Sequence, residues 1–239
     1  MIINLIYEVS IMKLVYKGKT KDVYQNDNGE IVLYFKDDMT GKDGVFDPGE
    51  NQVGLTVEGS GKAGLQMSSY LFEKINAAGI PTHYLDADVE ARTMKVKRIA
   101  VFGEGLEVIC RFKAVGSFIR RYGDYIEEGA DLPAYVEMTL KDDERGDPVI
   151  NEAALKTLNI LKPDEYQAVT DLTVRVSELI KDELAQKGLD LYDIKLEFGR
   201  DAETGEVLLI DELSGGNMRV FKEGESVDPL KIGDYLLNG

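Results

Sequence analysis

A chain of 239 residues with 44% apolar residues is long enough for one large domain or two smaller lobes around a buried core. Its 44 acidic residues outnumber the 28 basic ones, and the net charge of −16 argues against nonspecific binding to nucleic acid or to an anionic membrane. The single cysteine, Cys110, excludes an intramolecular disulfide and favours a cytoplasmic location, and the single histidine, His83, leaves catalytic triads and His-rich zinc sites without support.

The N-terminal segment has the pattern of a β-rich lobe. Residues 1–11 are apolar but have neither the basic start nor the small-residue cleavage site of a secretion signal, so we expect an extra strand or an upstream start codon there. Alternating apolar residues then predict strands at Lys13–Tyr16, Asp22–Gln25 and Ile31–Phe35, with an Asn-Gly turn between the last two.

Three lysines, Lys17, Lys19 and Lys21, surround Gly18 in the turn between the first two strands. A glycine lets the backbone approach a ligand closely, and ammonium groups neutralise phosphate oxygens, so this turn could cover the phosphates of a nucleotide. The alternative is an ordinary exposed basic loop. The turn does not have the G-x-x-x-x-G-K-[ST] pattern of a Walker A loop.

The middle of the chain predicts a loop, a helix and two strands. Residues 37–64 are dense in glycine and aspartate and predict a long loop, with a short strand at Asn51–Val57. The spacing of apolar residues from Lys62 to Ala78 predicts a helix that Gly79 ends. Two strands follow, at Thr93–Ile99 and Leu106–Phe112.

Arg111 lies at the end of the second of these strands, and Ser117 follows it at a predicted helix start. A guanidinium can grip a phosphate with two parallel hydrogen bonds, and a helix start offers a hydroxyl and free backbone N–H groups. The two residues therefore predict either a phosphate clamp or an ordinary N-cap.

Two helices and a hairpin complete the pattern. Asn151 is expected to cap a short helix, and a longer helix is predicted from Asp164 to Lys187, ending at Gly188. The runs LYDIKLEFG and EVLLIDELS then flank a polar segment that contains Gly205, which predicts a β-hairpin.

Charged side chains share one face of this hairpin. Asp193, Lys195 and Glu197 alternate along its first strand, and a turn near Glu203 would place Glu197 roughly opposite Asp211. A solvated polar face with screened ion pairs is one interpretation. The other is a magnesium site, because Mg²⁺ prefers carboxylate oxygens and takes nucleotide phosphates as further ligands.

Six segments occur together in an order and spacing that resembles the SAICAR synthetase family: KLVYKGKTKDVY, AGIPTHY, EVICRFKAVGSFIRRYG, LKDDERGDPVINE, DIKLEFGRD and IDELSGGNMR. The resemblance covers residues 13 to 230. It implies an α+β, two-lobed fold related to ATP-grasp enzymes, with antiparallel sheets and flanking helices. We expect a β-rich nucleotide-phosphate lobe at residues 1–98 and an α+β lobe with the metal and substrate site at residues 99–239.

The resemblance also implies an activity and its cofactors. The family couples the carboxylate of carboxyaminoimidazole ribotide to the amine of L-aspartate through an acyl phosphate, using ATP and Mg²⁺. We therefore expect small-molecule partners, neither nucleic acid nor membrane, and a homodimer.

Specific positions can be carried over from the family pattern. The residues matched to the ATP site are Lys17, Lys19, Lys21, Lys95 and Lys97, the two last in a strand that receives adenine by its backbone. The residues that face the substrate carboxylate are Lys195 and Asp193, and those matched to magnesium are Glu197 and Asp211. The residues matched to the ribotide phosphate are Arg111, Ser117 and Arg219, and those near the imidazole and aspartate are Asp38 and Asp147.

The sequence also departs from the family pattern near the acceptor site. Ser214-Gly215-Gly216 stands where the family has S-P-D, Ser60 and Gly64 replace a lysine and an asparagine, and Phe112 replaces an asparagine. Two alternatives therefore stand beside the family activity: a related carboxylate–amine ligase with another substrate, and a non-catalytic homologue.

Overall fold

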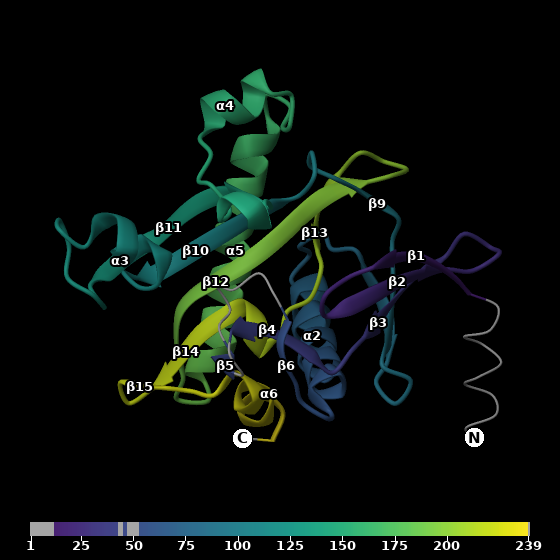
Figure 1. Ribbon diagram of the computed structural model, residues 1–239, viewed down its shortest axis with the longest axis horizontal. Helices are drawn as coiled ribbons and strands as arrows, with labels where there is room; N and C mark the ends of the chain where they lie inside the picture. The colour runs from purple at the N-terminus through teal and green to yellow at the C-terminus, as the bar shows by residue number, and fades with distance from the viewer. Residues whose placement is uncertain (1–11, 43–44, 47–52, 239) are drawn as a thin grey trace.

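The computed structural model describes residues 12–42, 45–46 and 53–238, and its architecture is α+β (Figure 1). Helices flank sheets whose paired strands are antiparallel, which confirms the predicted fold class. The strand expected within residues 1–11, and the beginning of the one expected at Asn51–Val57, lie outside the described residues. No helix in the described part of the chain is both long and apolar enough to cross a membrane.

The N-terminal strands form a five-stranded sheet. Its order is β1 (Lys13–Lys17), β2 (Lys21–Gln25), β3 (Ile31–Phe35), β8 (Thr93–Val96) and β7 (Tyr84–Asp88). The three predicted N-terminal strands are confirmed. Gly29, with φ of +83°, supplies the left-handed residue in the turn between β2 and β3.

Two predictions for this region are wrong. The strand predicted at Thr93–Ile99 ends at Val96, and Ile99–Val101 forms β9 in another sheet. The short strand predicted within the loop at 37–64 is confirmed as β6 (Val53–Thr56), but the rest of this segment is not a plain loop. It also contains β4 (Asp38–Lys42) and β5 (Val45–Phe46), which complete a three-stranded sheet with β6, and the start of α2. These strands are short and rich in glycine, so they show little apolar alternation.

The second sheet is organised around the long strand β12 (Asp190–Asp201), which runs diagonally through the centre of Figure 1. Its order is β11 (Asp131–Leu140), β10 (Leu106–Lys113), β12, β14 (Met218–Lys222) and β15 (Glu225–Ser226), and β13 (Val207–Ile210) and β9 pair with the far end of β12. The predicted hairpin is confirmed as β12 and β13.

Helices cover one face of this sheet and the space between the sheets. The apolar side chains Ile194, Leu196 and Phe198 of β12 are almost fully buried, in a cluster to which α5 (Glu165–Ala185) contributes. Helix α2 (Ser60–Ala77) packs on β3 and β7, and α6 (Pro229–Asn238) packs on α2. The charged residues of β12 alternate with the buried ones, so they lie on the opposite face.

Four short helices complete the fold: α3 (Ser117–Tyr122), η1 (Asp143–Arg145), α4 (Glu152–Thr157) and η2 (Gly215–Asn217). Asn151 caps α4 as predicted, because its side-chain oxygen accepts a hydrogen bond from Ala154 N at 2.9 Å.

Candidate active site

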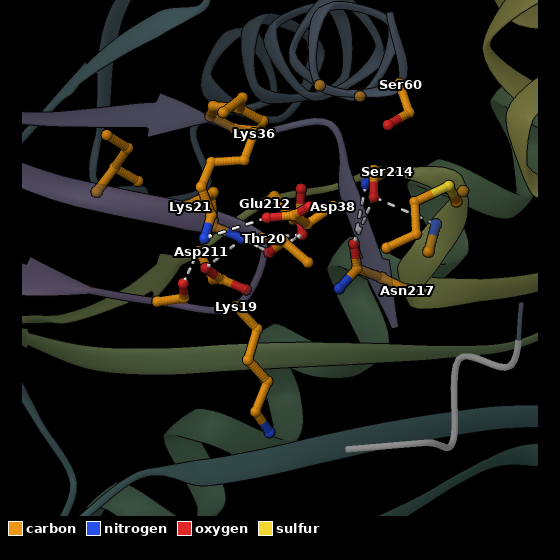
Figure 2. A pocket seen from close by; sticks show the side chains of 18 of the residues that line it. Lys19, Thr20, Lys21, Lys36, Asp38, Ser60, Asp211, Glu212, Ser214 and Asn217 are labelled. Carbon is orange, nitrogen blue, oxygen red and sulfur yellow. Dashed lines mark hydrogen bonds and ion pairs between the residues drawn. The ribbon is translucent and has the colours of Figure 1, made fainter. Parts of the chain in front are cut away.

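A cleft of about 510 Å³ is lined by residues from both large sheets. The turn between β1 and β2 contributes Gly18–Lys21, and the polar face of the second sheet contributes Glu107, Lys195 and Glu197. The start of α2, the turn after β13, η2 and α6 form the remaining walls. Figure 2 shows labelled side chains from these elements converging on one space.

Lys21 lies at the centre of a charged cluster in this cleft (Figure 2). Its ammonium is 3.1 Å from Asp211 Oδ1 and 2.8 Å from Glu212 Oε1, and it lies 5.6 Å from the centre of the Phe35 ring. Burial lowers the pKa of Lys21, but the two carboxylates outweigh burial and raise it above its usual range. Lys21 therefore stays charged.

The predicted pair Glu197 and Asp211 both line the cleft. Burial, and then the charge of Asp211, raise the pKa of Glu197, although Lys141 lies 2.7 Å away. Burial also raises the pKa of Asp211, but Lys21 and Lys141 outweigh it and bring the pKa to about 2. The two carboxylates therefore repel each other, and the nearby Lys21 and Lys141 offset this repulsion.

The predicted register of this pair is wrong by one residue. Glu197 pairs with Ile210, so Asp211 follows the last residue of β13. Strand alternation alone would send the Asp211 side chain to the apolar face. Asp211 has φ of +67°, however, and this left-handed backbone breaks the alternation, so that its carboxylate lies in the cleft. Among the described residues, no group of three or more His, Cys, Asp and Glu side chains is arranged to hold a metal ion.

A second hollow of about 130 Å³ adjoins the cleft. Glu107, Lys195 and Asn217 line both spaces. Five basic residues line the hollow: Arg111, Arg120, Arg121, Lys195 and Arg219. Ser117, Asp147 and Asp193 line it too, so all the residues predicted from the sequence to bind the ribotide phosphate come together here.

The guanidinium of Arg111 is hydrogen-bonded to protein groups on all sides. All five N–H groups of its guanidinium have protein acceptors: Glu137 Oε1 at 3.0 and 2.7 Å, Asp193 Oδ2 at 2.6 Å, Val115 O at 3.2 Å and Ser117 Oγ at 2.8 Å. Arg111 is only 2% exposed. In this arrangement it has no donor left for a phosphate, and it instead fixes the positions of Asp193 and Ser117.

The N-cap interpretation of Ser117 is wrong. The N-cap of α3 is Gly116, and Ser117 is the first helical residue, with its hydroxyl oxygen accepting from Arg111. Gly116 has φ of +60°, and a Cβ there would lie 2.7 Å from Nη1 of Arg219. Only glycine therefore lets Arg219 lie against the start of this helix. Arg219 donates to Asp193 Oδ2 at 2.7 Å and makes no other side-chain hydrogen bond with described residues.

The remaining predicted residues divide into two groups. Lys19 and Asp38 line the cleft, and the ammonium of Lys19 forms an ion pair with Asp143 of η1 across its mouth. Lys17, Lys95 and Lys97 line neither space.

The predicted adenine strand also differs from the structure. Lys95 pairs with Val32 of β3 on one side and with Asp86 of β7 on the other, so β8 is an interior strand at this point. Its backbone groups there are used within the sheet. The N–H of Lys97 donates to His83 O at 2.7 Å.

The altered positions of the predicted acceptor pocket are mostly in the cleft. Ser60, Gly64, Gly215 and Gly216 line it, whereas Phe112 does not. Phe112 is buried with the ammonium of Lys181 4.5 Å from its ring centre, on the α5 side of the sheet. At Gly215 a Cβ would lie 2.0 Å from the Pro229 carbonyl oxygen, so α6 occupies the space that a larger residue would need.

Sequence reasoning missed several lining residues. The wall formed by Pro229, Leu230 and Gly233 of α6 carries no motif, and Lys36 and Lys141 are ordinary lysines of a strand end and a loop. The pattern Gly59-x-Gly61-x-x-Gly64 at the start of α2 was a usable signal, but Asp37 already accepts from Gly61 N at 3.0 Å. A carboxylate of the protein itself thus satisfies this helix end.

A family model and two related proteins match most of the chain, and all three matches are to the same family. A family model described as SAICAR synthetase matches residues 14–231. The chain is 58% identical over 226 residues to a phosphoribosylaminoimidazole-succinocarboxamide synthase of Clostridium tetani, covering 95% of this chain and 100% of that protein. It is 38% identical over 221 residues to the protein of the same name from Streptococcus thermophilus, covering 90% of this chain and 88% of that protein.

Solved structures agree with these matches. A type-2 SAICAR synthetase in complex with ADP superposes with a TM-score of 0.81 at 29% identity, over 94% of this chain and 97% of that one. A phosphoribosylaminoimidazole-succinocarboxamide synthase from Ehrlichia chaffeensis gives a TM-score of 0.80 at 26% identity, over 95% of this chain and 93% of that one.

Proposed function

Because the chain belongs to the SAICAR synthetase family, and is an ATP-dependent ligase that forms SAICAR in purine biosynthesis, we propose how its two adjoining spaces divide the reaction. The enzyme joins the carboxylate of carboxyaminoimidazole ribotide to the amine of L-aspartate through an acyl phosphate and releases ADP and phosphate. The larger cleft would take ATP, and the smaller hollow would take the phosphate end of the ribotide.

The phosphates of ATP would lie beneath the turn between β1 and β2. Lys19 and Lys21 line the cleft from this turn, and Lys36 holds the turn by donating to Gly18 O at 2.8 Å. The similarity to an ADP-bound SAICAR synthetase supports a nucleotide in this lobe. Lysine ammonium groups would neutralise the phosphate oxygens as charge moves during phosphoryl transfer.

Glu197 and Asp211 would hold Mg²⁺. Their carboxylates are half-buried in the cleft and repel each other, which is the donor set and the charge balance that suit a hard cation. Mg²⁺ typically binds through one or two carboxylates and takes phosphate oxygens and water as its other ligands. When bound, the ion would neutralise charge on the transferring phosphoryl group.

The ribotide phosphate would lie in the smaller hollow. Arg219, Arg120 and Arg121 line it with charged donors, and Arg111 and Asp193 hold Arg219 and Ser117 in position. Asp147 also lines the hollow, and its carboxylate accepts from Asp142 N at 2.8 Å. This arrangement would leave the imidazole carboxylate pointing toward the cleft.

The position of Lys195 between the two spaces is the observation that supports the proposal most strongly. It lines both spaces, and its ammonium is 2.7 Å from Glu107. A carboxylate held there would have ATP on one side and the ribose phosphate site on the other. A carboxylate is a poor electrophile, so one of its oxygens must first take the γ-phosphoryl group of ATP before the aspartate amine attacks. The protein's part is positioning and charge neutralisation.

One assay tests this division. ADP release is measured with ATP, magnesium, the ribotide and L-aspartate, and each component is then omitted in turn. Release that requires all four supports the proposal. Turnover that is indifferent to the ribotide would instead identify a ligase with another substrate, and no release under any condition would identify a non-catalytic homologue.

We also propose the lobe boundary, the assembly and the location. The chain leaves the five-stranded sheet at Val96 and enters the other sheet at Ile99, which supports lobes of residues 1–98 and 99–239. A homodimer is the simplest closed assembly and can be tested by light scattering. A buried free thiol and phosphorylated substrates suit the cytoplasm.

A further inference from the structure

Asn217 of η2 stands at the junction of the two spaces. With Glu107 and Lys195 it lines both the cleft and the smaller hollow. Glu107 and Lys195 are held to each other at 2.7 Å, and Thr139 Oγ1 donates to the second oxygen of Glu107 at 3.2 Å. Asn217 is thus the uncharged member of the three, and the resemblance to the family gave it no role.

The side-chain amide of Asn217 is held in one orientation. Its Oδ1 accepts from Ser214 N at 3.0 Å and from Ser214 Oγ at 3.1 Å. A flipped amide would set its NH₂ group against the Ser214 N–H, so the assignment of oxygen and nitrogen is fixed by the donor it faces. Figure 2 shows the amide nitrogen turned away from Ser214.

The turn that carries Asn217 cannot shift easily. Gly216 N donates to Ser214 Oγ at 3.2 Å, and Gly215 lies directly against the Pro229 carbonyl of α6. Two hydrogen bonds and a close backbone contact therefore preorganise the amide. Its Nδ2 donates to no partner among the described residues, although the group is half-buried.

The charges around the junction indicate what this donor would bind. The cleft already contains the carboxylates of Glu107, Glu197 and Asp211. A further carboxylate at the junction would repel a carboxylate substrate, whereas an amide N–H attracts its oxygen without adding charge. The family pattern has an acidic residue in this turn, and this chain has glycine at that place and an amide next to it.

We propose that Nδ2 of Asn217 donates a hydrogen bond to the carboxylate of the imidazole ribotide, beside Lys195, and orients it toward the γ-phosphate of ATP. The inference rests on the proposed placement of ATP and the ribotide. Asn217 holds one carboxylate oxygen. The other oxygen attacks the γ-phosphorus, the bond from that phosphorus to the β–γ bridging oxygen breaks, and ADP leaves with the electron pair. Asn217 thus contacts the substrate directly and neither gains nor loses a proton in this step.

The test is Asn217→Asp in the full-length protein. Aspartate keeps an oxygen that can accept from Ser214, but it replaces the N–H donor with a repelling carboxylate. We expect the KM for the ribotide to rise about 30-fold, since a donor is lost and an anion faces an anion. The KM for ATP should stay within about twofold, because the proposed hydrogen bond is made to the ribotide and not to the nucleotide.

A matched control is Asn76→Asp on α2. It makes the same chemical change outside both spaces, and the Oδ1 of Asn76 likewise accepts a hydrogen bond, from Thr82 Oγ1 at 2.7 Å. Its KM for the ribotide should equal that of the unmodified protein. Calorimetric binding of the ribotide without ATP provides a readout that does not depend on turnover.

Three results would overturn the inference. The first is a folded Asn217→Asp protein with an unchanged KM for the ribotide. The second is an equal rise in both KM values, which would assign Asn217 to the nucleotide. The third is loss of the native unfolding transition in both Asn217→Asp and Asn217→Ser, which would make Asn217 a residue of the turn alone. An unmodified protein that releases no ADP would refute the proposed function instead.

Discussion

Replacement of Arg111 by lysine distinguishes a structural role from the phosphate-binding role that the sequence predicted. Arg111 is 2% exposed, and its guanidinium makes five hydrogen bonds to four residues. Lysine keeps the positive charge but has three N–H donors on one nitrogen, so it cannot reach acceptors on opposite sides of a planar fork.

The cost follows from the contacts that are lost. An ammonium could stay near Glu137 and Asp193, but the hydrogen bonds to Val115 O and Ser117 Oγ would disappear. At about 1.5 kcal/mol for each hydrogen bond from a charged donor, we expect the free energy of unfolding to fall by about 3 kcal/mol. For a chain of this size that corresponds to a Tm lower by about 6–12 °C.

Urea and thermal unfolding measure this loss directly. Arg120→Lys is the matched control, since Arg120 is exposed and makes no side-chain hydrogen bond with described residues, and it should change the free energy of unfolding by less than about 0.5 kcal/mol. The reasoning is refuted if Arg111→Lys unfolds within about 1 kcal/mol of the unmodified protein while its KM for the ribotide rises more than tenfold. That result would indicate that Arg111 binds the ribotide phosphate directly.

Three further predictions concern the cleft and the core. Glu197→Gln and Asp211→Asn should each lower kcat by at least about 100-fold in a protein that still unfolds cooperatively, and near-full activity in either would contradict the metal assignment. Lys19→Met should raise the KM for ATP about tenfold, while Lys13→Met on exposed β1 should not; equal effects would contradict a specific phosphate contact. Burial raises the pKa of the Cys110 thiol to about 11, so the thiol stays protonated at pH 8. Iodoacetamide should therefore label Cys110 only after the protein is unfolded in urea, and mass spectrometry can detect the label. Rapid labelling of the native protein would contradict the buried position.

Much of the fold was accessible from local pattern. The strands at β1, β2, β3 and β10 and the helices α2 and α5 have clear apolar periods, and the β12–β13 hairpin has a polar turn with Gly205 in the left-handed conformation, at φ of +76°. The two faces of β12 were also predicted, because Asp193, Lys195 and Glu197 alternate with three apolar residues. A period of two is sufficient to assign faces.

Other features of the site depend on contacts that no local pattern encodes. The carboxylate of Asp211 lies in the cleft because the backbone of this residue is left-handed. From the sequence, Asp211 looks like an ordinary residue at the end of a strand. Arg111 has the sequence context of a phosphate ligand. Its guanidinium donates to carboxylates of Glu137 in β11 and Asp193 in β12, which are 26 and 82 residues away in the sequence. The wall formed by α6 depends on a contact between Gly215 and Pro229 that only the tertiary structure defines.

The pairing of charges in the cleft without ligands has a consequence for binding. Lys21 is held by Asp211 and Glu212, Lys141 by Glu197 and Lys195 by Glu107, so each of these lysines already has a carboxylate partner. On the proposed assignment, ATP with its metal would exchange partners: lysine would turn to phosphate, and carboxylate to the cation. The number of charges with a partner would stay the same, so little new desolvation would oppose binding, whereas removal of one partner would leave a buried charge alone. Neutralising a lysine of the cleft should therefore lower stability as well as affinity, and neutralising both members of a pair should restore stability without restoring turnover.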